Sequence, residues 1–141
     1  MHQESNPFLT SPIDSDWFLR SLVQAVNRHD LMLGITLTVG GTLITGTLVP
    51  GHEYFRDLAE QVAASADDDE EAAQQLRDTF ASLGAIYARG GEDGDQLPSY
   101  IHLRDVRFFS PGGGSLPDHD GVWWRGRIDQ VQGFVLGNVV A

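Results

Sequence analysis

Apolar and polar residues alternate most regularly between positions 121 and 129. The even-numbered positions of this stretch are apolar or small, whereas Trp123, Arg125, Arg127 and Asp129 occupy the other parity. A period of two places the two sets on opposite faces of a β-strand. We therefore predict a strand with Trp124 in the core and an outer face that carries an aromatic ring between guanidinium groups.

Other stretches predict further strands. Residues 33–39 and 42–49 alternate in the same way, and Gly40-Gly41 between them suits a tight hairpin turn. Gly46 predicts a bend or bulge in the second of these strands. In the stretch 100–109 the apolar positions change parity halfway, so a bulge near Asp105 is needed to bring them onto one face. A short last strand is expected within 131–136.

Helical spacing of apolar residues predicts three helices. The first runs from about Asp16 to Asn27, capped by Asp14-Ser15-Asp16. Its apolar stripe comprises Phe18, Leu19, Leu22, Val23 and Val26. The second covers 52–64. The third covers 69–89, and the acidic run 67–71 is expected to cap it, because carboxylates are favourable at a helix N-terminus.

These elements predict an α+β fold with a small, strongly bent antiparallel sheet and an N-terminal helix. The helical segment 52–89 is then a two-helix insertion within a single domain, 14–141, and residues 1–13 form a flexible tail. The first helix, the hairpin strands Ile35–Val39 and Ile44–Val49, the third strand Ile101–Val106 and the Arg125-Gly126 step resemble an Sm-like barrel. A closed barrel of that kind is thus one form that the sheet could take.

Composition restricts the partners and the compartment. The formal net charge is −11 and all nine cations are arginines, so binding to nucleic acid or to an anionic membrane is not expected. The chain has no cysteine and no apolar run of the roughly 20 residues that span a bilayer. Nothing at the N-terminus has the pattern of a secretory signal. We therefore expect a cytoplasmic protein.

No arrangement of residues predicts catalysis. The five histidines lack the spacing of a metal pair, and Asp118-His119-Asp120 suits a surface turn better than an ion. We predict that the protein is not an enzyme and that it has no metal site and no cofactor. A small metal-dependent hydrolase using His102 and His119 is the weaker alternative. Trp and Arg are the residue types enriched in binding hot spots. The predicted interaction face is therefore composed of Trp123, Arg125, Arg127, Arg104 and Arg107.

Four segments together resemble the gas vesicle accessory protein U (GvpU) family: Asp16–Leu19, Gly34–Gly41, Ile101–Leu103 and Gly121–Ile128, of which the last is the most specific. The resemblance implies a cytoplasmic, non-enzymatic protein associated with gas vesicles. It also implies self-association into a homo-oligomer and contact with a vesicle shell protein, which would promote vesicle clustering or assembly. The Sm-like resemblance implies a different function, an RNA-binding ring, which the net charge disfavours.

Overall fold

The computed structural model describes residues 16–89, 97–112, 114–117 and 121–138. Helix α1 spans Trp17–His29, and the side chain of Asp16 caps it by accepting a hydrogen bond from the backbone N–H of Phe18 at 2.9 Å. The predicted start of this helix is confirmed, and its end lies two residues beyond the predicted one. The predicted tail 1–13 lies outside the described residues.

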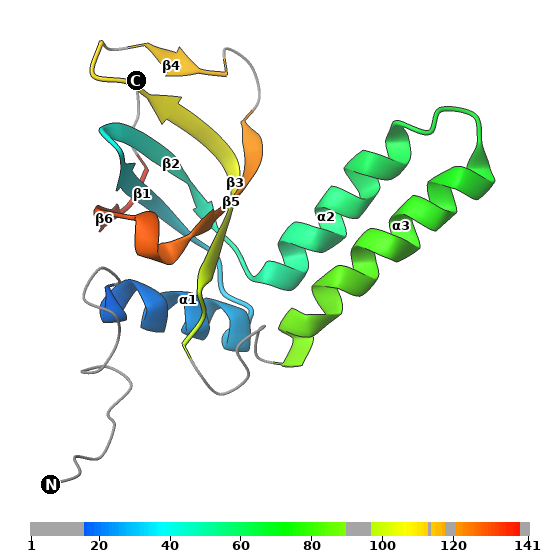
Figure 1. Ribbon diagram of the computed structural model, residues 1–141, viewed down its shortest axis with the longest axis horizontal. Helices are drawn as coiled ribbons and strands as arrows, with labels where there is room; N and C mark the ends of the chain where they lie inside the picture. Colours follow the sequence, from blue (N-terminus) through cyan, green and yellow to red (C-terminus); the bar gives the residue numbers. More distant parts are fainter. Residues whose placement is uncertain (1–15, 90–96, 113, 118–120, 139–141) are drawn as a thin grey trace, which may run out of the picture.

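Six strands form one antiparallel sheet (Figure 1). Their bounds are Leu33–Val39 (β1), Thr42–Leu48 (β2), Tyr100–Phe109 (β3), Ser115–Leu116 (β4), Val122–Arg127 (β5) and Gly133–Leu136 (β6). The order is β4-β3-β2-β1-β6, and β5 also pairs with β3. Gly40 and Gly41 both have positive φ, 57° and 84°, as a hairpin turn between β1 and β2 requires.

Two irregularities bend the sheet where the sequence predicted them. Asp105 has φ 55°, and the pairing of β3 with β5 shifts between Leu103 and Val106. The pairing of β2 with β3 shifts at Gly46, where a Cβ atom would lie 2.9 Å from the carbonyl oxygen of Arg104. The bulge turns Val106 to the same face as Ile101, and both are fully buried.

The core lies between α1 and one face of the sheet, which we call the inner face. It is built from aliphatic side chains: Leu19, Val23, Val26, Ile35, Leu37, Ile44, Leu48, Ile101, Leu103, Val106, Ile128 and Val131. Trp124 packs against this cluster, as predicted. Phe18 does not, although it belongs to the predicted stripe: it is 50% exposed and its ring instead lies 5.4 Å from that of Phe134.

Two helices and a 3-10 turn connect β2 to β3: α2 (Gly51–Ala64), α3 (Glu70–Gly84) and η1 (Ala85–Arg89). Figure 1 shows α2 and α3 as an antiparallel hairpin whose base lies beside the sheet and whose tip projects away from it. The acidic run lies at the tip, where Asp69 caps α3 through the N–H of Ala72 at 3.0 Å. The predicted third helix thus ends at Gly84 instead of residue 89.

The α+β class with an N-terminal helix is confirmed. Among the described residues no pairing joins β6 to β5, so the sheet is open and the closed Sm-like barrel is not confirmed. Strand β4 was not predicted from the sequence, and it is only two residues long. No helix within the described ranges is long and apolar enough to cross a membrane.

Candidate interaction site

The predicted interaction residues lie on the outer face of β3 and β5, opposite the core. The register pairs Tyr100 with Arg127 and His102 with Arg125, so these four residues share a face. Trp123 has the same parity as Arg125 and lies on that face too. The alternation read from the sequence therefore assigns the two faces of β5 correctly.

Helix α2 and η1 cover part of this outer face with aromatic rings. The ring of Tyr54 lies 4.8 Å from that of His102 and 5.9 Å from that of Trp123, nearly perpendicular to the latter. The ring of Tyr87 lies 5.1 Å from His102 and stacks on Phe55 at 5.9 Å. Trp123 is therefore half-buried against the protein's own hairpin.

His102 lies at the centre of these rings and is 1% exposed. Neither ring nitrogen has a hydrogen-bond partner. Burial, and secondarily the positive charge of Arg125, lowers the pKa of His102 to about 3. Burial also raises the pKa of the Tyr54 phenol, with Arg125 opposing the shift. Both side chains are consequently neutral near pH 7.

The two arginines of β5 differ in their contacts. The guanidinium carbon of Arg125 lies 3.8 Å from the centre of the Tyr100 ring and 5.9 Å from that of Phe55, which is a cation–π arrangement. Arg127 donates to the Asp129 carboxylate at 2.6 Å, and 61% of its side chain is exposed. Both arginines are exposed, so both are accessible to a partner.

Arg104 and Arg107 continue the same face along β3 toward β2, where they pair with Thr47 and Thr45. The Nε atom of Arg104 lies 3.7 Å from the Asp105 carboxylate. Arg107 donates to the carbonyl oxygen of Pro117 at 2.9 Å. All five predicted residues therefore share one sheet face, part of which the hairpin covers.

Sequence reasoning missed the aromatic side chains that cover His102, namely Tyr54, Phe55 and Tyr87. The available signal was the parity of Tyr100 and His102, which is opposite to that of Ile101. An aromatic and imidazole pair opposite a core face indicates a second packing layer, but the sequence does not reveal which helix supplies it.

The structure adds no observation in favour of the predicted alternatives to a binding role. Among the residues that the structure describes, no three His, Asp or Glu side chains are close enough to hold a metal ion. The Asp118-His119-Asp120 turn lies outside those residues. His102 contacts rings and is sealed from solvent, so it is not placed to act on a substrate.

Fold and site together define a small α+β protein whose most distinctive surface is an aromatic, arginine-rich strand face partly covered by a helical hairpin. The family model described as gas vesicle protein GvpU-like matches residues 16–139. The chain therefore belongs to the GvpU-like family of gas vesicle proteins, which confirms the resemblance and supports a role associated with gas vesicles. No curated protein and no solved structure was found to match.

Proposed function

We propose that this protein is a non-enzymatic gas vesicle accessory protein that self-associates in the cytoplasm and binds a vesicle shell protein. By bridging vesicles or shell subunits it would promote their clustering or assembly. Family membership supports the vesicle role. The observation that carries self-association is an exposed apolar surface at the terminal strand of the sheet.

This apolar edge comprises Trp17 and Phe18 of α1, Leu136 of β6 on the core side of the sheet, and Val135 of β6 on the opposite side. Val135 and Leu136 are 61% and 58% exposed, and β6 ends the strand order. Leu136 pairs with Ile35 and so faces the core side of the sheet, yet α1 leaves it uncovered. An apolar strand of a second copy added to β6 would cover it and extend the hydrogen-bonded ladder.

The outer face of β3 and β5 is the proposed contact for the shell protein. It concentrates four of the nine arginines of a chain whose net charge is −11. Guanidinium groups form bidentate contacts with carboxylates, so this face suits acidic groups on a partner. Arg127 is the best single anchor, because 61% of its side chain is exposed and it pairs with a residue close by in the chain, Asp129.

The two surfaces can be tested separately. Val135→Asp should shift sedimentation of the pure protein toward the monomer, because it places a charge on the apolar edge. Leu83→Asp is its matched control, since Leu83 is 53% exposed on α3 and lies outside that edge. Unchanged association in Val135→Asp, or an equal loss in both variants, would exclude the edge.

For shell binding, purified vesicles are mixed with the protein and collected by flotation. Arg127→Glu should reduce the bound fraction severalfold, whereas Arg77→Glu should not. Arg77 is an arginine of α3 that is likewise bound to a carboxylate, that of Glu60, away from the proposed face. Equal binding of all three proteins would show that the shell contact lies elsewhere.

A further inference from the structure

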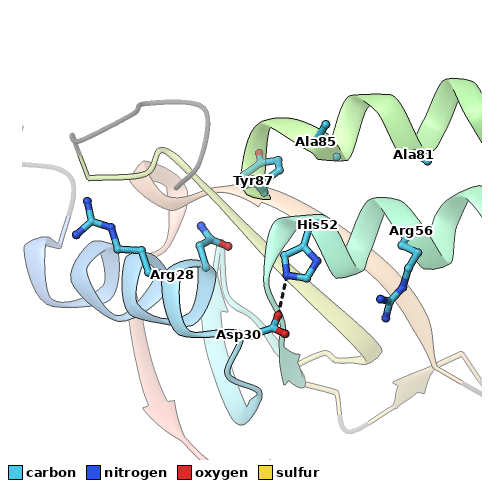
Figure 2. Close-up of a pocket in the computed structure, with 9 residues that line it drawn as sticks. Arg28, Asp30, His52, Arg56, Ala81, Ala85 and Tyr87 are labelled. Atoms are coloured by element: carbon cyan, nitrogen blue, oxygen red, sulfur yellow. Dashed lines mark hydrogen bonds and ion pairs between the residues drawn. The ribbon is translucent and has the colours of Figure 1, made fainter. Parts of the chain in front are cut away.

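A pocket of about 470 Å³ lies where the end of α1, the first turns of α2 and the end of α3 meet (Figure 2). Its volume is within the range of roughly 300–1,000 Å³ typical of small-molecule sites. Its walls combine small residues on α3 with polar and charged residues on α1 and α2. They are Asn27, Arg28, Asp30, His52, Arg56, Ala81, Gly84, Ala85 and Tyr87.

Asn27 is the feature of this pocket that points to a ligand. Its side chain is 5% exposed, and its Oδ1 accepts a hydrogen bond from the N–H of Gly51 at 2.9 Å. Because a backbone N–H can only donate, this contact identifies the oxygen of the Asn27 amide and therefore also its nitrogen. Its Nδ2 is buried and has no partner. Buried donors are almost always satisfied, so an acceptor bound in the pocket would remove a free-energy cost that the folded chain otherwise carries.

The charges around Asn27 favour an anionic acceptor. Arg28 and Arg56 line the pocket together with a single carboxylate, that of Asp30, which is bound to His52 at 2.7 Å. Arg56 also pairs with Glu53. Figure 2 shows Arg28 and Arg56 on opposite sides of His52 with their guanidinium ends turned outward.

Helix α2 adds to this field. It begins at Gly51, next to the lining residue His52, and its N-cap residue, Pro50, supplies no side-chain hydrogen bond. The side-chain Oδ1 of Asn27 instead accepts from the N–H of Gly51, and the acidic residue of the first turn, Glu53, is paired with Arg56. Anions are stabilised at such helix starts, so the dipole and the arginines act in the same direction.

We propose that this pocket binds the oxyanion group, phosphate or carboxylate, of a small solute. One oxygen would accept from Asn27 Nδ2, and Arg28 would turn inward on its flexible side chain to compensate the charge. The proposal concerns a ligand that the vesicle role does not require. Its test uses the pure protein alone, so it can fail or succeed independently of the proposed function.

The side-chain amide of Asn27 is a direct reporter. In ¹H–¹⁵N NMR spectra its NH₂ signals should move in a saturable way when sodium phosphate, or in a second arm sodium acetate, replaces sodium chloride at constant ionic strength. The arm with the lower Kd identifies the preferred group. If the Asn27 signals move in neither arm, the proposal is wrong.

Three variants separate this site from general salt effects. Asn27→Asp keeps an oxygen for the Gly51 N–H but replaces the donor by an acceptor, so binding should be lost, and its missing NH₂ pair assigns the signals. Arg28→Gln should raise Kd about tenfold, the effect of losing one charge-assisted contact. Arg77→Gln, outside the pocket, should leave Kd unchanged. Equal Kd values for the wild type and Arg28→Gln, or binding retained by Asn27→Asp, would overturn the proposal.

Discussion

The two faces of β3 are packed by different means. On the inner face Ile101, Leu103 and Val106 are fully buried aliphatic residues, covered by α1 and by neighbouring strands. On the outer face His102 is as deeply buried, at 1% exposure, but its neighbours are the rings of Tyr54 and Tyr87, and both its nitrogens lack hydrogen-bond partners.

This difference shows that the buried fraction of a side chain does not by itself determine how much its contacts contribute to the free energy of folding. The inner face gains free energy from apolar area and loses none to unpaired polar groups. The outer face gains aromatic area, but part of the gain is offset by an unsatisfied imidazole. We infer that the inner face determines most of the stability of the domain. The outer face holds the helical hairpin on the sheet more weakly, and this contact depends on pH.

The largest effect is expected on the inner face. Leu103→Ala should lower the free energy of unfolding by about 2–5 kcal/mol, because it leaves a cavity among aliphatic side chains. Tyr54→Ala, which removes a larger but half-exposed side chain from the outer face, should cost less. Urea denaturation measures both. If Tyr54→Ala costs as much as Leu103→Ala, the two faces contribute equally and the comparison is wrong.

Two glycines test the faces with one and the same change. A Cβ atom at Gly126 would overlap the ring of Trp124 on the inner face, and one at Gly51 would overlap the ring of Tyr87 beneath the hairpin. Each Gly→Ala change should cost about 1–3 kcal/mol through overpacking. Gly133→Ala is the control, because nothing lies within 4 Å of its Cβ position.

Hydrogen exchange distinguishes where the two glycine variants act. Gly51→Ala should reduce amide protection mainly in α2, α3 and η1, and Gly126→Ala mainly in β3 and β5. Loss of protection spread over the whole domain in Gly51→Ala would mean that the hairpin and the sheet unfold as one unit.

The parts that sequence reasoning predicted are those that depend on local periodicity. The change of parity around Asp105 is visible in ten consecutive residues, so the bulge could be predicted. The burial of His102 could not, since it results from contacts with Tyr54 and Tyr87, which come from a separate helical segment. Likewise the pocket brings together Asn27, His52 and Gly84, and no short motif contains all three.

Acid is expected to destabilise the fold through His102 on the outer face. The pKa of His102 is lowered to about 3 in the folded protein, against 6.5 for an ordinary histidine. Its contribution to stability is therefore complete above pH 6.5 and is lost as the pH falls from 6.5 toward 3. One pH unit below 6.5 the loss is about 1.4 kcal/mol.

Urea denaturation at several pH values gives the slope of the free energy of unfolding against pH. His102→Phe should remove the contribution of His102 to this slope, whatever its effect at neutral pH. A phenyl ring suits the same aromatic surroundings and does not titrate. His29→Gln, at the exposed end of α1, should keep the wild-type slope. An unchanged slope in His102→Phe would show that His102 is hydrated and not sealed.

The smallest effect concerns Arg125, whose guanidinium group lies over the Tyr100 ring. Arg125→Gln should lower stability by about 0.5–1 kcal/mol, the value of a cation–π contact at an accessible site.

The same change removes a positive charge that helps to lower the pKa of His102, so the acid-induced loss of stability should also become smaller. Arg127→Gln is the matched control on the same strand, because Arg127 pairs with Asp129 and the lowered pKa of His102 is due to burial and Arg125. If Arg125→Gln lowers stability but leaves the pH dependence as in the wild type, burial alone accounts for the lowered pKa of His102, and the electrostatic link between β5 and the ring cluster is absent.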